Sequence, residues 1–186
     1  LPERAWLLLD EALVDFAGPA ATRAALDLLD DAPRLLVFRT LSKAYGLAGL
    51  RCGWALGPAD AAEDLAGVAP AGALSTAVQT GALEALRKTG PLVERRAAQV
   101  AAERARLAEA LAGSPYDTRP SSANVVWLRL PGVSGPTLAR RLEDHAVRVA
   151  AGSAWGDDDH VRAQVQSPAA TDRLLAALEH AADASS

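Results

Sequence analysis

Residues 40–54, TLSKAYGLAGLRCGW, place a lysine in a glycine-rich segment that has no acidic residue. Lys43 is one of only two lysines in a chain of 186 residues that otherwise takes its positive charge from arginine. The other, Lys88, precedes Thr89 and Gly90, as expected of a cation in the last turn of a helix. A lysine in a tight, uncharged loop loses solvation, which favours the neutral amine that attacks carbonyl carbon. The segment therefore predicts Schiff-base chemistry at Lys43.

The composition limits the classes of function. Half of the residues are hydrophobic, which is enough for the core of one large or two small domains. The net charge of −4 and the scattered arginines argue against nucleic-acid binding. Cys52 is the only cysteine and the three histidines lack metal-ligand spacing, so neither a disulfide nor a metal site is expected.

The chain shows no sign of a membrane segment. No apolar run approaches the roughly 20 residues that a membrane helix needs, and a cytoplasmic location is expected. The chain opens with LPERAW and contains no methionine. We therefore expect it to be the C-terminal part of a longer protein.

The first half of the chain alternates apolar runs with helical patterns. The runs at 5–12 (AWLLLDEA), 34–38 (RLLVF) and 53–57 (GWALG) predict buried strands, and the periodicity of 19–31 predicts a helix. Strands that alternate with helices indicate an α/β fold with a mainly parallel sheet.

The second half has a different character. A long helix is predicted over 91–113, and the domain boundary is expected near Gly90 and Pro91, with this helix bridging the two parts. A separate small α+β domain follows, with predicted strands at 123–130, 147–150 and 160–165 and helices at 135–146 and 168–181.

Several polar groups fall where the predicted strands of the first half end. Asp10 ends one strand. Thr40 and Ser42 lie before Lys43 in the lysine segment, and Arg51 lies after it. An arginine, hydroxyls and glycine amides can hold a phosphate group, and a carboxylate can pair with a protonated ring nitrogen. Together with Lys43 for the aldehyde, these are the groups that pyridoxal phosphate requires.

These residues also carry a family resemblance. The stretches 7–16 (LLLDEALVDF) and 38–54 (FRTLSKAYGLAGLRCGW) resemble the lysine region of class I/II aminotransferases of the fold-type I pyridoxal-phosphate superfamily, most closely the histidinol-phosphate aminotransferase group. The similarity continues through 70–86, 121–130 and 159–165, so it covers nearly the whole chain.

The resemblance implies a fold and an activity. Residues 1–90 would be the C-terminal part of the cofactor-binding large domain, and 91–186 the small C-terminal domain with the bridging helix. The activity implied is transfer of an amino group between an amino acid or amino-alcohol phosphate and a 2-oxo acid. A homodimer with pyridoxal 5'-phosphate as cofactor is implied as well.

The resemblance also assigns roles to residues. Lys43 would be the catalytic residue that binds the cofactor covalently, and Arg162 would bind the substrate carboxylate. The remaining cofactor-binding positions would be Asp10, Ala12, Thr40, Ser42 and Arg51. Arg148 is a second substrate-binding candidate.

The chain departs from the family pattern at two positions. Leu13 stands where the family usually has a tyrosine that donates to the cofactor's phenolic oxygen. Arg148 lies one residue out of phase with the arginine that binds the substrate phosphate, and such a shift turns a strand side chain to the other face. Two alternatives stay open: a decarboxylase resembling threonine-phosphate decarboxylase, and a non-catalytic aminotransferase-like domain.

Overall fold

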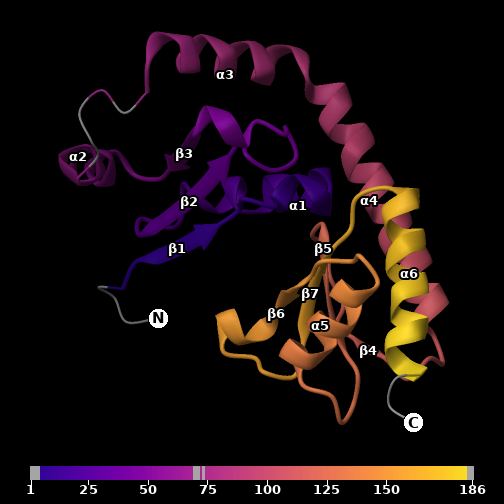
Figure 1. Cartoon of the computed structure of the whole chain (residues 1–186). Coiled ribbons are helices and arrows are strands. Elements are labelled where there is room, and N and C mark those ends of the chain that lie inside the picture. Colours follow the sequence, from indigo (N-terminus) through magenta and orange to yellow (C-terminus); the bar gives the residue numbers. More distant parts are fainter. Residues whose placement is uncertain (1–4, 69–71, 73, 184–186) are drawn as a thin grey trace. The chain divides into compact units, whose positions relative to one another are not determined.

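The computed structural model describes residues 5–68, 72 and 74–183. The chain divides into two compact units, one ending at Ala97 and the other beginning at Ala98. The division falls within helix α4 (Gly90–Leu111). Each unit contains its own sheet (Figure 1).

The first unit is built on a three-stranded sheet in the order β1-β2-β3. The strands are β1 (Leu7–Asp10), β2 (Leu35–Thr40) and β3 (Gly53–Leu56). β1 and β2 are parallel, whereas β2 and β3 are antiparallel. The α/β class expected from the sequence is confirmed, but the third strand runs against the parallel direction.

The direction of β3 follows from the content of its connection to β2. A parallel pair is usually joined by a crossover that contains a helix packed on one face of the sheet. Among residues 41–52, which join the two strands, the one helical segment is the short 3-10 turn η3 (Ala48–Leu50). The chain therefore reverses direction at the sheet edge instead of crossing a face.

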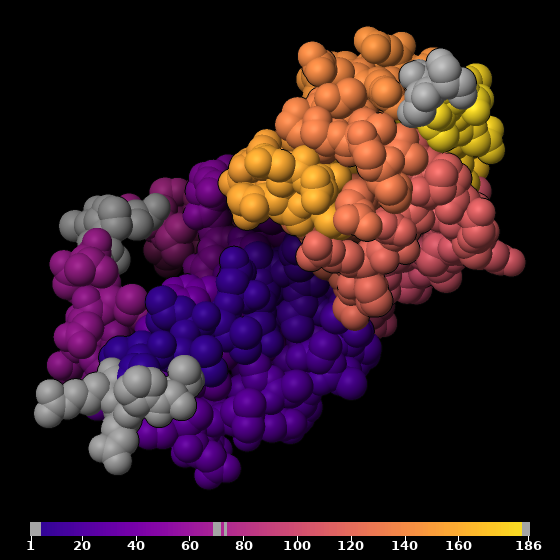
Figure 2. All heavy atoms as spheres, turned by 90° about the horizontal axis from the view of Figure 1, so that it is seen from below, coloured from indigo at the N-terminus to yellow at the C-terminus, as the bar shows by residue number. Residues whose placement is uncertain are grey.

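β1 differs from the strand that the sequence predicts. An apolar run of this kind was expected to be buried on both faces, yet Leu7 and Leu8 are 46% and 62% exposed. β1 is the edge strand of this sheet, and the indigo residues of this segment are visible at the surface in Figure 2. An edge strand without a neighbour leaves its backbone groups and side chains to solvent.

Short helices and two small cores complete the first unit. One core contains Ala25, Leu35 and Val37, and the other contains Leu41 and Cys52 with Ala82. The helical segments are η1 (Val14–Ala17), α1 (Pro19–Ala24), η2 (Leu26–Leu28), α2 (Ala59–Val68) and α3 (Thr76–Lys88). The second core lies beneath the lysine loop and helps to fix its backbone.

The second unit contains a four-stranded antiparallel sheet in the order β4-β5-β7-β6. The expected alternation in β7 is confirmed: Val161, Ala163 and Val165 are buried, whereas Arg162 is partly exposed and Gln164 exposed. The strands are β4 (Asp117–Thr118), β5 (Val125–Arg129), β6 (Ala150–Ala151) and β7 (Val161–Gln164).

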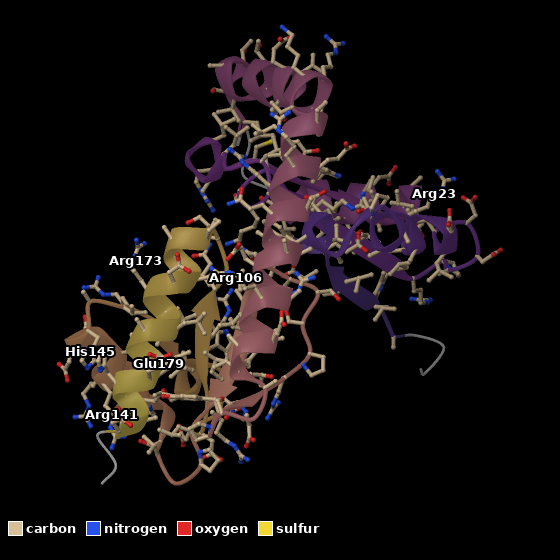
Figure 3. The ribbon with its side chains drawn as sticks, turned by 90° about the vertical axis from the view of Figure 1, so that its right-hand side faces the viewer. Arg23, Arg106, Arg141, His145, Arg173 and Glu179 are labelled. Atoms are coloured by element: carbon tan, nitrogen blue, oxygen red, sulfur yellow. The ribbon has the colours of Figure 1, made fainter. Side chains whose placement is uncertain are left out.

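Helices α5 (Gly135–Asp144) and α6 (Pro168–Asp183) accompany this sheet. Arg106 of α4 links α4 to α6 through hydrogen bonds to Asp172 and to the Pro168 carbonyl (Figure 3). Tyr116 donates from its hydroxyl to the Leu178 carbonyl at 2.7 Å, and burial raises the pKa of this tyrosine to about 12.

Of the helices in the described residues, none is both long and apolar enough for a membrane span.

Candidate active site at the lysine loop

Three strand ends meet at one edge of the first sheet. Asp10 ends β1 and Thr40 ends β2, and the parallel pairing of these strands puts their carboxyl ends together. Gly53, which begins β3, pairs with Thr40. The loop of residues 41–52 therefore lies at the same edge as Asp10 and carries Lys43 (Figure 1).

The lysine loop is fixed by buried side chains and by backbone hydrogen bonds. Leu41 and Ala44, on either side of Ser42 and Lys43, are 0% and 1% exposed. The Leu41 amide donates to the Cys52 carbonyl at 3.1 Å, and the Leu47 amide donates to the Leu41 carbonyl at 2.9 Å. The loop backbone is therefore held rigidly beneath an outward-pointing lysine.

Gly46 and Arg96 hold the other end of the loop. Gly46 has a φ of 74°, and a Cβ there would lie 3.1 Å from the Arg96 guanidinium. Arg96 donates from Nη1 to the Ala44 carbonyl at 2.9 Å. A residue with a side chain at position 46 would meet both backbone strain and the arginine that secures the loop.

Lys43 itself is exposed. The loop was expected to remove this side chain from water, and that expectation is wrong for the part of the chain that the structure describes. The uncharged residues around it, Leu41 and Ala44, fill the core below the loop and do not cover the amine. The loop thus presents the amine at the sheet edge, where another molecule can reach it.

Three oxygen atoms cluster beside the lysine. The Thr40 hydroxyl oxygen lies 2.9 Å from that of Ser42 and 3.1 Å from the Cys52 carbonyl oxygen. It also accepts the Ser42 amide at 3.1 Å. The Ser42 and Thr40 hydroxyls are therefore held at fixed positions one and three residues before Lys43, close to where an anion can bind.

Arg51 adds a positive charge in a strained backbone. Its φ of 52° places it in the left-handed region, which a non-glycine residue occupies at a cost of roughly 1–3 kcal/mol. The side chain is exposed and donates from Nη1 to the Ala48 carbonyl at 3.0 Å. Strain of this kind concentrates at functional sites, and here it ends the turn that returns the chain to β3.

Asp10 has one oxygen engaged and one available. Oδ1 accepts the Ala12 amide at 2.9 Å, which fixes the carboxylate at the end of β1 and occupies the amide of Ala12. The side chain is exposed, and no donor among the described residues is bonded to Oδ2. Asp10 can therefore receive a hydrogen bond from a protonated group at the sheet edge.

Sequence reasoning missed a buried ion pair behind this edge. Glu11 is 9% exposed and accepts from Arg39 Nε and Nη2 at 2.9 and 2.7 Å. Arg39 Nη2 also donates to the Thr22 carbonyl. The signal for this pair was the arginine placed directly before Thr40 in an otherwise apolar strand.

Two further ionisable groups lie near this pair. Burial raises the pKa of the Asp15 carboxyl, while the Arg39 charge acts in the opposite direction. Burial also raises the pKa of Tyr45, and the Asp15 charge adds to that shift. Glu11, Asp15, Arg39 and Tyr45 thus connect the segment after β1 with the lysine loop.

The two candidate substrate residues lie in the second unit. The Arg162 guanidinium lies 5.5 Å from the centroid of the Trp155 ring. Within the described ranges, no ion pair joins Arg162 to Asp158 or Asp159, the carboxylates just before its strand. Arg148 is exposed, lies outside β6, and pairs with Glu143 at 3.2 Å.

Comparison with known proteins adds to this geometry. The model of a family described as aminotransferase class I and II matches residues 2–178. An aromatic amino acid aminotransferase of Cutibacterium acnes is 33% identical over 181 residues, which is 97% of this chain and 50% of that protein. Histidinol-phosphate aminotransferase 2 of Thiobacillus denitrificans is 38% identical over 146 residues, or 77% of this chain and 40% of that protein.

A solved structure is similar over the full chain. The histidinol-phosphate aminotransferase from Sinorhizobium meliloti, in complex with pyridoxal-5'-phosphate, has a TM-score of 0.81 and 28% identity and covers 100% of this chain and 51% of its own. The chain spans about half the length of the curated relatives it matches.

Proposed function

Because the chain belongs to the aminotransferase class I and II family, we propose that it forms the lysine-bearing part of a pyridoxal-phosphate-dependent aminotransferase. The observation that carries the proposal is the exposed Lys43 on a rigid loop at the sheet edge where Asp10 also lies. An amine held this way is available to a carbonyl compound.

The donor groups at this edge fit pyridoxal phosphate. Ser42 and Thr40 offer hydroxyls and Arg51 a guanidinium for the phosphate. Asp10 has a free carboxylate oxygen for the ring nitrogen. These groups, with Lys43 for the aldehyde, match the cofactor's anionic, cationic and electrophilic parts one by one, so we assign them to its binding. Ala12 takes part through its backbone amide, which holds the Asp10 carboxylate in place.

When bound, pyridoxal phosphate supplies an aldehyde that condenses with amines and a ring that withdraws electrons from the substrate's α carbon. Lys43 would provide the amine that holds this group, and its Nζ would accept the α proton of the substrate. The Asp10 carboxylate would hold a proton on the ring nitrogen. Ser42, Thr40 and Arg51 would bind the phosphate and so orient the whole group.

The reaction is tested by its products. With an amino acid as donor, the full-length protein (called the full chain below) should release a 2-oxo acid and no carbon dioxide, because the lysine takes the α proton and leaves the carboxylate in place. Product analysis by mass spectrometry, with trapping of carbon dioxide, distinguishes the outcomes. Carbon dioxide in amounts equal to the amine formed would favour the decarboxylase, and neither product would favour a non-catalytic domain.

Substrate binding is assigned to Arg162, on a polar face of β7. A planar guanidinium binds a carboxylate through two parallel hydrogen bonds, a geometry that lysine cannot reproduce. The names of the relatives support an amino acid or an amino-alcohol phosphate as donor. Arg148, which is exposed and pairs with Glu143, is the second candidate, for a phosphate on the substrate.

The Arg162→Lys variant of the full chain should lose about 1.5 to 3 kcal/mol of transition-state stabilisation toward donors that carry a carboxylate, the range of a charge-assisted hydrogen bond. Amines without a carboxylate should be affected much less. Comparison of kcat/KM for the two donor types measures the difference. An equal loss for both, or no loss for either, would remove Arg162 from the role of carboxylate ligand.

The assembly and location of the protein belong to the same proposal. A homodimer in the cytoplasm accords with the aminotransferase family. Light scattering of the full chain measures its mass in solution, and cell fractionation tests the location.

A further inference from the structure

Arg162 has an aromatic neighbour that the proposed function does not use. Its guanidinium lies over the Trp155 ring, 5.5 Å from the centroid. Trp155 belongs to the 3-10 turn η4 (Gly152–Trp155) and is 56% exposed. About half of the Trp155 surface is thus in solvent, and its ring contacts the guanidinium as a cation–π pair.

A second tryptophan supports the first. Trp127 of β5 lies directly opposite Arg162 in the pairing of β5 with β7, so both side chains project from the same face of the sheet. The rings of Trp127 and Trp155 meet edge to face, with centroids 5.7 Å apart and planes at 81°. This arrangement is favourable for aromatic pairs and restrains the Trp155 ring.

Backbone hydrogen bonds fix both ends of the turn that carries Trp155. The Gly152 amide donates to the His160 carbonyl at 2.8 Å, and the Asp157 amide donates to the Gly152 carbonyl at 3.1 Å. A Cβ on Gly152 would lie 2.4 Å from the Asp157 carbonyl oxygen, so only glycine fits. The Asp157 carboxylate also lies 2.8 Å from the His160 ring. The turn therefore holds Trp155 at one place beside Arg162.

The contact leaves the binding groups of Arg162 available. The ring attracts the positive charge of the guanidinium, whereas a carboxylate binds through hydrogen bonds from its N–H groups. Within the part of the chain that the structure describes, no carboxylate or carbonyl is hydrogen-bonded to these N–H groups of Arg162. An arginine restrained by the ring has fewer conformations to lose when a carboxylate binds.

We propose that Trp155, restrained by Trp127, positions the Arg162 guanidinium for the carboxylate of the substrate. The inference rests on the proposed function, in which Arg162 is the carboxylate ligand. Trp155 is a positioning residue: it acts through Arg162 and fixes the plane in which the carboxylate is bound. It thereby favours donors and acceptors that have a carboxylate over simple amines and aldehydes.

The test uses the full chain loaded with cofactor. Trp155→Leu should raise the KM for a carboxylate-bearing donor about 2- to 10-fold, the range of a cation–π contact, with kcat changed less. The affinity for propionate, an unreactive carboxylate, should fall by the same factor in an equilibrium titration. Trp155→Phe keeps a ring under the guanidinium and should restore both values to within about twofold of the parent.

Trp6→Leu is the matched control. Arg34 lies 5.8 Å from the Trp6 ring centroid, so this variant removes a similar contact at the opposite end of β1 from Asp10. It should leave propionate affinity unchanged.

The outcomes separate the inference from the proposed function. Equal effects of Trp155→Leu on amines with and without a carboxylate, unchanged propionate affinity, or a Phe variant as weak as Leu would each overturn the positioning role. If Arg162→Lys itself left propionate affinity unchanged, the failure would lie with the proposed carboxylate ligand.

Discussion

Lys43→Ala should abolish turnover by the full chain while leaving its fold intact. Loss of the proton transfer alone is expected to lower the rate by about 100- to 10,000-fold, and loss of the covalent anchor for the cofactor adds to this. Unfolding is not expected, because the Lys43 side chain is exposed and makes no hydrogen bond or ion pair with any described residue. Steady-state kinetics and far-ultraviolet circular dichroism measure the two effects separately.

The second lysine provides the control. Lys88 is exposed near the end of α3, where it pairs with Glu84. Lys88→Ala should retain full activity. Reduction of the loaded protein with borohydride, followed by peptide mapping, should place the cofactor on Lys43 in the parent and nowhere in Lys43→Ala. Cofactor attached to Lys88, or activity retained without Lys43, would refute the assignment.

The order and contiguity of the site residues made the lysine loop predictable. The segment 40–54 contains its own turn residues and its own polar groups, so its chemistry is local in sequence. Asp10 was predictable for a different reason: the carboxyl ends of parallel strands meet at one edge, which brings residues 30 positions apart into one site. The alternation in β7 similarly placed Arg162 on the polar face of its strand.

The features that escaped prediction depend on contacts between distant segments. The direction of β3 depends on how a connection of twelve residues closes, and the exposure of Leu8 depends on which strands adjoin β1. The contact of Arg162 with Trp155 depends on the path of a turn. Apolar periodicity reports that a residue has a preferred face, but it does not identify the group that faces it.

The Glu11–Arg39 pair is the clearest of these distant contacts, and disrupting it should have the largest effect on stability. The two side chains are 8% and 14% exposed. Removing one partner of a buried pair leaves the other charged and without compensation, which typically costs about 3–5 kcal/mol. We therefore expect Arg39→Met and Glu11→Leu each to lower the free energy of unfolding of the cofactor-free full chain by that amount, measured by urea denaturation.

The double variant and an exposed pair separate charge burial from general perturbation. Glu11→Leu combined with Arg39→Met removes both charges, so its loss should be well below the sum of the single losses. Arg23 of α1 pairs with Asp27 of η2, and their side chains are 79% and 60% exposed; Arg23 is labelled in Figure 3. Arg23→Met should cost less than about 0.5 kcal/mol, as is usual for surface ion pairs.

The same pair should also control the geometry of the site. Glu11 follows Asp10 and Arg39 precedes Thr40, so the ion pair connects the two chain segments that carry the proposed cofactor ligands. In Arg39→Met the Glu11 amide, which donates to the Phe38 carbonyl at 2.9 Å, should exchange its hydrogen faster, and the dissociation constant for pyridoxal phosphate should rise. Additive losses in the double variant, or unchanged exchange at Glu11, would mean that the pair neither stabilises this edge of the sheet nor holds Asp10 in register with the lysine loop.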